Sequence, residues 1–268
     1  MISRPTRDRV LARLGIDTTA PTLDGLCTVY RAWCRQVSFD NVQKRISLME
    51  QHDHLAGGEP EEFFGNFLVH GTGGTCWPTS AGLAALLESL GFRIRRLVAA
   101  MNYERIGIRP GHGSTVAEID GRDWLVDSSM LTVEPFELRR GNRTERADPV
   151  HAIAAEPHEG RWIIRWMRHD GETMPCMILE ESVPPERFTT SYESTRPGRT
   201  PFNTALIARR SLPDGGTLDV RSDTLTRVSP SGVRAAGPLE DRTRLLVEEF
   251  GYSREIVARL PPDDGPAT

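Results

Sequence analysis

The sequence predicts an α+β protein, with a helical N-terminal region, a β-rich middle and a smaller α/β end. Three observations support this fold class. Leucines at positions 83, 86, 87 and 90 recur at helical spacing, and such patterns dominate the chain up to Gly91. After Gly91 the apolar residues follow the shorter period of strands. Residues 245–250 then restore a helical pattern near the end of the chain.

Length and composition exclude several classes of protein. The chain has 268 residues, 38% hydrophobic and 26% charged, which is ordinary for one or two globular domains. No apolar run is long enough for a membrane span, and the N-terminus lacks the apolar core of a secretory signal. A net charge of −4 argues against nucleic-acid binding through bulk charge. Four cysteines in so long a chain predict free thiols in the cytoplasm rather than a disulfide framework.

The predicted helices precede Gly91. Residues 1–15 form a short amphipathic pattern that Gly15 can end, and residues 22–35 place their apolar side chains on one face. Residues 63–69 are short and apolar. A glycine-rich loop at 70–80 then leads into a strong helix, with Gly91 where a C′ glycine belongs.

The strands are predicted beyond that glycine. Residues 213–216 (Pro-Asp-Gly-Gly) indicate a hairpin turn. Residues 184–201 hold four prolines and predict an irregular crossing segment, residues 245–250 a last helix ended by Gly251, and residues 261–268 a frayed end. The expected strands are 93–101, 113–119, 122–127, 162–167, 177–179, 203–209 and 217–221.

Cys76 is the most informative residue for function. It lies between the glycine-rich loop and the start of a helix, and Pro78 suits the first helical turn. The free amides and the positive end of the helix dipole favour a thiolate there and can hold a developing oxyanion. A small buried cysteine at a helix start is the alternative.

His112 and Asp127 supply a base and an orienting carboxylate. Asp120-Gly121 predicts a two-residue hairpin in which Ser114 lies opposite Asp127. Because side chains alternate along a strand, His112 shares the face of Ser114 and is a diagonal neighbour of Asp127. Asp127 can therefore fix the tautomer of the imidazole. A turn histidine and a strand-end capping carboxylate are the alternatives, and the fold must bring Cys76 close to the pair.

These residues resemble motifs of the arylamine N-acetyltransferase family. Gly73-Gly74-Thr75-Cys76, then His112, then Trp124-Leu-Val-Asp127 match its Arg-Gly-Gly-x-Cys motif, its His and its Trp-x-x-Asp strand. Three further segments are similar, in the family's order: residues 38–42 (Ser-Phe-Asp-Asn-Val), residues 192–202, and residues 250–251. The ordered set spans nearly the whole chain.

The resemblance implies a helical bundle, a β-barrel and an α/β lid around a cysteine-proteinase-like core. The expected domains are residues 1–91 (bundle with the nucleophile), 92–188 (barrel with His112 and Asp127), 189–202 (interdomain segment) and 203–268 (lid).

It also implies a ping-pong reaction. Cys76 takes an acyl group from a thioester such as acetyl-CoA, and an amine, hydrazine or hydroxylamine then receives it. No tightly bound cofactor and no metal are expected. Arg196, Arg199 and Thr200, in the segment near the cleft, are expected to contact the donor phosphates.

The sequence departs from the family pattern around the three reacting residues. Thr72 replaces the family's Arg, Pro78 a Glu, Ser80 an Asn, and residues 128–130 (Ser-Ser-Met) a Gly-Phe-Gly. Loss of the Arg and the Glu together indicates a compensated pair. The changes at Pro78 and at residues 128–130 alter the surroundings of the sulfur, and they put the acetyl-CoA and arylamine specificity in question.

Other functions stay open at this point. An amide synthase would attack a thioester on an acyl carrier protein. A cysteine hydrolase or transglutaminase-type enzyme could use the same three residues. A non-catalytic binding module could keep the fold, which the motif departures favour and the intact Cys76, His112 and Asp127 do not. Arg93, Arg95 and Arg96 are interpreted as a solvated strand face rather than phosphate contacts, and His52 and His54 as a solvated loop rather than metal ligands.

Overall fold

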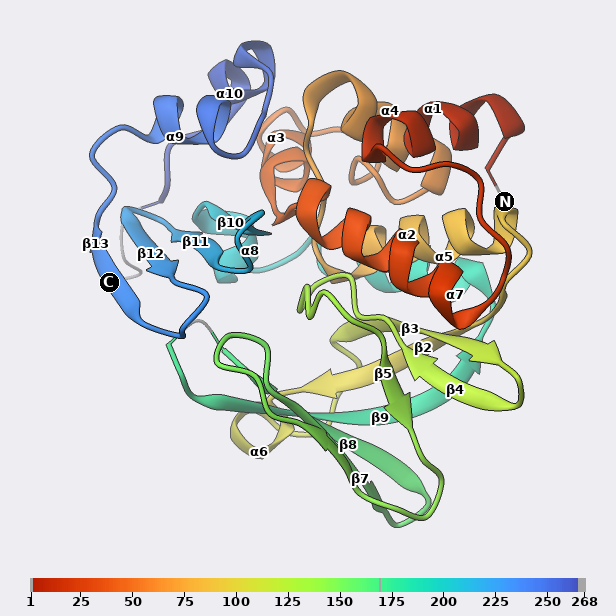
Figure 1. The fold of residues 1–268 in the computed structure, drawn as a ribbon. Helices are drawn as coiled ribbons and strands as arrows, with labels where there is room; N and C mark the ends of the chain where they lie inside the picture. The colour runs from red at the N-terminus through yellow and green to blue at the C-terminus, as the bar shows by residue number, and fades with distance from the viewer. Residues whose placement is uncertain (1, 169, 265–268) are drawn as a thin grey trace.

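The computed structural model describes residues 2–168 and 170–264 (Figure 1). The helices are α1 (Arg4–Leu14), α2 (Leu23–Gln36), α3 (Val42–Met49), α4 (Pro60–His70), α5 (Cys76–Ser89), α6 (Tyr103–Ile106), α7 (Pro185–Glu193), α8 (Pro201–Thr204), α9 (Arg242–Glu248) and α10 (Arg254–Arg259). The strands are β1 (Phe39–Asp40), β2 (Arg93–Met101), β3 (His112–Ile119), β4 (Arg122–Leu125), β5 (Phe136–Leu138), β6 (Thr144–Arg146), β7 (Ile153–His158), β8 (Arg161–Met167), β9 (Thr173–Val183), β10 (Ile207–Ser211), β11 (Thr217–Arg221), β12 (Thr224–Val228) and β13 (Arg234–Pro238).

The N-terminal helices form as their sequence predicts. Ser3 and Thr22 cap α1 and α2 through their side chains, and Gly15 ends α1 in the left-handed conformation. The apolar faces of α1, α2, α4 and α5 pack into one core, in which Trp33 stacks on Phe63 with ring centroids 5.9 Å apart. This bundle fixes the position at which α5 begins.

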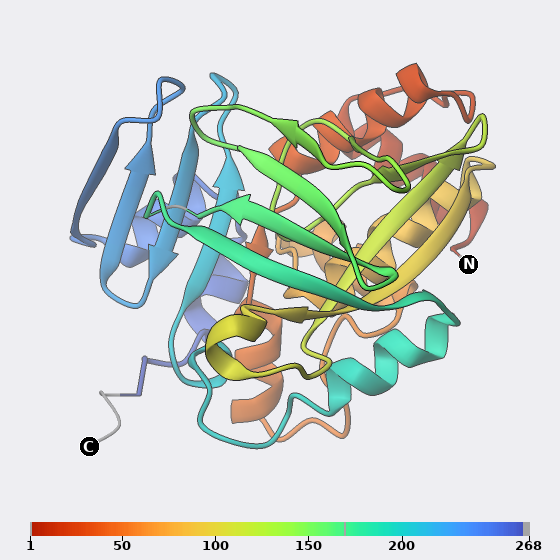
Figure 2. The same cartoon turned by 90° about the horizontal axis from the view of Figure 1, so that it is seen from below.

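Eight antiparallel strands form a nearly closed barrel, which lies below these helices in Figure 1 and faces the viewer in Figure 2. Their order is β5-β4-β3-β2-β9-β8-β7-β6, and Thr144 of β6 donates a side-chain hydrogen bond to the Glu137 carbonyl of β5 across the remaining gap. The predicted hairpin register is confirmed, because Ile119 pairs with Arg122. The α+β fold class is likewise confirmed. Trp162, Trp166 and Ile164 are among the side chains that fill the barrel core.

A second sheet brings the two ends of the chain together. Its order is β1-β10-β11-β12-β13, so the two-residue strand β1 joins strands that lie some 170 positions later in the sequence. Phe39 pairs with Arg209, and Phe39 also forms a parallel bridge with Gly74. Helices α3, α9 and α10 supply apolar side chains to the core of this layer.

Three predictions about the C-terminal third are wrong. Residues 184–201 contain the helix α7 and the first residue of α8, because Pro185 and Pro201 occupy first helical turns, where a proline is tolerated. The strand expected at 203–209 therefore begins only at Ile207. Residues 261–264 are held rather than frayed, since Asp263 forms an ion pair with Arg45 at 2.7 Å. Residues 265–268 lie outside the described part.

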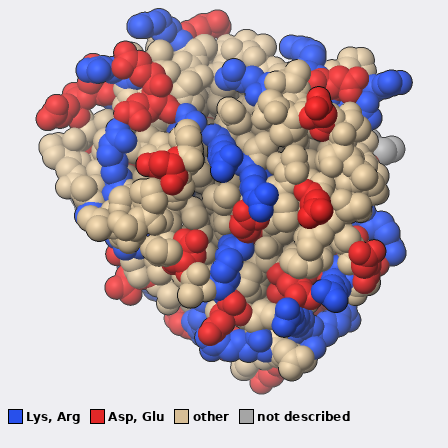
Figure 3. Space-filling view, viewed as in Figure 1, with Lys and Arg blue, Asp and Glu red and all other residues tan. Residues whose placement is uncertain are grey.

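The face shown in Figure 3 carries no large patch of one charge, because basic and acidic side chains are interspersed over it. In the described ranges, no helix is long and apolar enough to cross a membrane.

Candidate active site

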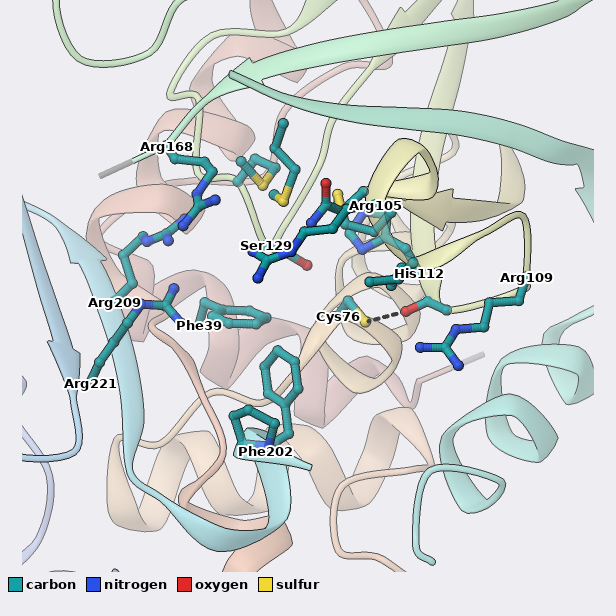
Figure 4. Close-up of a pocket in the computed structure, with 17 residues that line it drawn as sticks. Phe39, Cys76, Arg105, Arg109, His112, Ser129, Arg168, Phe202, Arg209 and Arg221 are labelled. Atoms are coloured by element: carbon teal, nitrogen blue, oxygen red, sulfur yellow. Dashed lines mark hydrogen bonds between the residues drawn. The ribbon is translucent and has the colours of Figure 1, made fainter. Parts of the chain in front are cut away.

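Cys76 is the first residue of α5 and opens into a cavity of about 480 Å³ (Figure 4). Thr75 occupies the N-cap position, and within the described chain its side chain makes no capping hydrogen bond to this helix. The first backbone N–H groups of α5 are therefore available to a group bound at the sulfur. The thiol donates a long hydrogen bond of 3.8 Å to the Gly111 carbonyl, on the segment that leads into β3.

The glycine-rich loop before Cys76 is braced by Asp40. Its carboxylate accepts hydrogen bonds from the Gly73 amide at 2.7 Å, from the Ser38 hydroxyl at 2.7 Å and from the Tyr252 hydroxyl at 2.8 Å. Burial raises the pKa of Asp40, while these three donors act to lower it. A side chain at Gly73 would lie 1.8 Å from the Ser38 carbonyl oxygen, so only glycine fits there.

His112 and Asp127 form a fully buried pair. His112 Nε2 and Asp127 Oδ2 are 2.7 Å apart, and Ser114 donates to the same oxygen at 2.7 Å. The other carboxylate oxygen accepts the amides of Ser129 and Met130, each at 2.9 Å. With Nε2 facing the carboxylate, Nδ1 is the ring nitrogen left to exchange a proton with the sulfur.

The electrostatics of this pair favour two opposite charges. Burial lowers the pKa of His112, but the Asp127 charge and hydrogen bond, with a further contribution from Cys76, raise that pKa to about 10. Burial also raises the pKa of Asp127, but the His112 cation and the Ser114 and Met130 donors outweigh it and hold the pKa below its usual range. The arrangement therefore stabilises an imidazolium next to the Cys76 sulfur.

Two of the departures from the family motifs, Ser80 and Ser128, contact one another, and the other two are held by neighbouring residues. Ser80 and Ser128 have hydroxyl oxygens 2.9 Å apart, and Ser80 also donates to the Gly113 carbonyl at 2.8 Å. Thr72 is buried and accepts a hydrogen bond from Gln43 at 3.1 Å. Pro78 packs so closely on Gly74 that a β-carbon there would lie 2.8 Å from the proline ring. The loop is thus held by hydrogen bonds and packing where the family motif places an Arg and a Glu.

The lining of the cavity contains both aromatic side chains and arginines. Phe39 and Phe202 meet edge to face with ring centroids 6.1 Å apart. The described lining contains five arginines and no Asp or Glu. The lining residues are Phe39, Cys76, Met101, Asn102, Arg105, Ile106, Arg109, Gly111, His112, Ser129, Met130, Arg168, Met174, Pro201, Phe202, Arg209 and Arg221.

The residues expected to contact donor phosphates lie outside this lining. Arg196 binds the Glu193 carboxylate at 3.2 Å and the His52 carbonyl at 3.0 Å. Arg199 is exposed and faces Asp264 at 3.4 Å, and Thr200 occupies the N-cap of α8.

The strand arginines considered earlier are also engaged elsewhere. Arg93, Arg95 and Arg96 form ion pairs with Glu118, with Asp123 and Glu181, and with Glu88, respectively. Within the described residues, no group of three His, Cys, Asp or Glu side chains could hold a metal ion.

Sequence reasoning missed the arginines that do line the cavity. Arg209 and Arg221 are the last residues of two predicted strands, and a basic residue at such a position is expected to face solvent. The signal that could have found them is Asp219, a carboxylate inside the predicted strand 217–221 that needs buried cationic partners.

Comparisons with known proteins agree with this geometry. A family model described as N-acetyltransferase matches residues 22–253. The arylamine N-acetyltransferase of Mycolicibacterium smegmatis is 27% identical over 212 residues, which cover 70% of each chain. The solved structure of Mycobacterium marinum arylamine N-acetyltransferase superposes with a TM-score of 0.80 at 19% identity, covering 94% of this chain and 97% of that one. The same protein in complex with CoA gives a TM-score of 0.73 at 18% identity, with the same coverage.

These matches define the class of protein as an acetyltransferase enzyme. The chain belongs to the arylamine N-acetyltransferase family, as the ordered motifs indicated.

Proposed function

We propose that the protein is a cysteine-dependent N-acetyltransferase that transfers an acetyl group from acetyl-CoA through Cys76 to a small aromatic amine, hydrazine or hydroxylamine. The observation that carries this proposal is the placement of His112, which is held by Asp127 on one side and adjoins the Cys76 sulfur on the other, at the cavity wall. The structure of a family member with CoA supports the choice of donor.

The first half-reaction forms an acyl-enzyme. The Cys76 thiolate attacks the thioester carbonyl, with the imidazolium of His112 beside it. The first amides of α5 supply donors for the oxyanion. The bond between the carbonyl carbon and the CoA sulfur breaks, and the leaving thiolate takes the proton from His112.

The second half-reaction transfers the acetyl group to the amine and regenerates the free enzyme. The amine attacks the Cys76 thioester and gives its proton to neutral His112. The bond between the carbonyl carbon and the Cys76 sulfur breaks, which releases the amide. Asp127 keeps the imidazole in one orientation throughout. We place this reaction in the cytoplasm, where the reducing conditions keep Cys76 free.

Intact-protein mass after mixing with acetyl-CoA tests the proposal. Wild type should gain one acetyl group, and Cys76→Ala should gain none. Cys27→Ala is the matched control, because Cys27 is also a half-buried free thiol but lies outside the cavity lining.

Added aromatic amine should then discharge the acetyl group much faster than water does. An acetyl adduct that still forms in Cys76→Ala would refute the role of Cys76 as the nucleophile. Absence of an adduct, while Cys76 still reacts with an alkylating agent, would refute acetyl-CoA as the donor and point to a longer or carrier-bound thioester.

A further inference from the structure

Three of the cavity arginines come from both sheets and meet at one end of the pocket. Arg168 follows β8 of the barrel, whereas Arg209 and Arg221 belong to β10 and β11 of the second sheet. Their guanidinium groups point toward one another beyond the Phe39 ring, on the side away from Arg109 (Figure 4). We call Arg168, Arg209 and Arg221 the arginine trio.

Strand register explains why two of these side chains face the cavity. Phe39 pairs with Arg209, and Arg209 pairs with Asp219, so the three side chains share one face of the sheet. Arg221 lies two residues after Asp219 and points to the same face. Since Phe39 also bridges to Gly74 in the nucleophile loop, this face is directed at the space beside Cys76.

Asp219 holds the two strand arginines by their inner nitrogens. Its carboxylate accepts from Arg209 Nε at 2.8 Å and lies 2.9 Å from Arg221 Nε. Within the described residues, these two contacts with Asp219 are made by Nε and not by the terminal Nη groups of either arginine. A guanidinium anchored at Nε presents its Nη groups outward, in the fork that matches a carboxylate or phosphate.

The trio carries more positive charge than its carboxylates balance. In the described part of the chain, the carboxylates within ion-pair distance are Asp219 and, for Arg168, Asp170 at 2.5 Å. Burial lowers the pKa of Arg221, as do the neighbouring charges of Arg209 and Arg168, against the effect of Asp219. An anion placed among the three would relieve this repulsion.

The position of the trio indicates which molecule supplies the anion. The cavity that joins it to Cys76 has a volume of about 480 Å³, which encloses a small molecule. In CoA the phosphates are separated from the thioester by the whole pantetheine arm, so a donor bound at Cys76 extends beyond such a cavity. A compact acceptor can reach from the sulfur to the trio across the Phe39 and Phe202 rings.

We propose that Arg168, Arg209 and Arg221 form an anion subsite that binds a carboxylate, or a similarly shaped oxyanion, carried by the amine acceptor. The preferred acceptor then has an apolar, aromatic body on Phe39 and Phe202, its amine at Cys76 and its negative charge at the trio. This substrate class rests on the proposed acetyl transfer.

Binding without donor tests the subsite independently of catalysis. Calorimetric titrations compare 3- and 4-aminobenzoate and 4-aminophenylacetate with their matched carboxamides. For the acid of fitting length, wild type should bind the carboxylate at least about tenfold more tightly than the carboxamide. Arg221→Gln and Arg168→Gln should each lose most of that preference. Arg227→Gln should keep it, because Arg227 lies on β12, pairs with Glu249 and does not line the cavity.

The rate at which acetyl-CoA acetylates Cys76 shows whether the trio binds a carboxylate of the acceptor or a phosphate of the donor. In the trio variants the loss of carboxylate preference should exceed any loss of acetylation rate, and Arg227→Gln should keep the wild-type acetylation rate. Slower acetylation of these variants by about tenfold, with no carboxylate preference in wild type, would assign the trio to a donor phosphate and overturn the acceptor assignment. Equal binding of acid and amide, with unchanged acetylation, would refute the subsite. A carboxylate preference in a protein that acetyl-CoA does not acetylate would refute the proposed function and leave the subsite standing.

Discussion

The hydroxyl oxygens of Ser80 and Ser128 lie 2.9 Å apart, which joins the nucleophile helix α5 to the turn that carries Asp127. Both serines occupy positions where the chain departs from its family's motifs, so the two departures form one hydrogen-bonded unit. The Ser128 hydroxyl oxygen also lies 2.9 Å from the Thr79 hydroxyl oxygen, which adds a second contact with the same helix. The distance between the Cys76 end of α5 and Asp127 therefore depends on these small side chains.

A double-mutant cycle measures that link. Ser80→Ala and Ser128→Ala should each lower the free energy of unfolding by about 1–2 kcal/mol, because each leaves a buried partner without its hydrogen bond. The double variant should cost about 0.5–1.5 kcal/mol less than the sum of the two. Urea unfolding of the four proteins gives these values, and strict additivity would show that the serines act independently.

The variant Asp127→Asn should remove the charge that holds His112 while leaving the protein folded. The amide oxygen can still accept from Ser129 and Met130, so the fold should persist, but the charge that holds imidazolium at His112 is lost. Acetylation of Cys76 by acetyl-CoA should slow by about 10³–10⁴-fold, by analogy with the loss of the carboxylate in other triads. Rapid-quench mass measurements give the rate. Asp120→Asn, the same change in an exposed turn, should leave it unchanged, and comparable rates in both variants would contradict the role of Asp127.

The stability that His112 provides should disappear with rising pH. Its pKa is raised from 6.5 to about 10 in the folded protein, so its contribution is complete below pH 6.5 and is lost between 6.5 and about 10. The pKa of Lys44 is lowered to about 8 by burial, which gives an opposite trend. The measurement is therefore the difference in unfolding free energy between wild type and His112→Gln, in which the Lys44 effect cancels. That difference should shrink from pH 6 to pH 10, and a constant or growing difference would contradict the charged pair.

Gly73→Ala should disrupt the loop that carries the nucleophile. Its new β-carbon would meet the Ser38 carbonyl oxygen at 1.8 Å, a backbone atom that cannot move aside cheaply. We expect a loss of about 3 kcal/mol or more in the free energy of unfolding. Gly65→Ala is the matched control, because Gly65 is exposed within α4 with open space around it, and alanine should stabilise that helix by about 0.5–1 kcal/mol. Thermal unfolding of both variants tests the contrast, which equal effects would contradict.

Local patterns were enough to predict much of the fold. The helix that begins at Cys76 and the hairpin between Ile119 and Arg122 depend on neighbours in sequence, and both form as expected. The strand β1 could not be predicted, because two residues carry no periodic signal and its partner Arg209 is distant in the chain. The helices α7 and α8 were missed because prolines that begin a helix look the same, in sequence, as prolines that interrupt one.

The candidate site was predictable to a similar extent. Alternation along two adjoining strands places His112 near Asp127, and the structure gives 2.7 Å between them. The closeness of Cys76 to His112 required the packing of α5 on the barrel, which no local pattern contains. The cavity arginines could not be predicted, because their position depends on the pairing of the second sheet. The expected phosphate contacts Arg196 and Arg199 form ion pairs outside the cavity lining, and their role stays a prediction.

The short strand β1 fixes the distance between the nucleophile loop and the arginine end of the cavity. Gly74 of the nucleophile loop, Phe39 and Arg209 are neighbours on one hydrogen-bonded ladder, so the span from the reacting sulfur to the charged end of the cavity is set by backbone spacing. In the proposed acceptor subsite, this backbone spacing sets the length of the acceptor that fits, so a change in preferred length should require a substitution on the ladder itself.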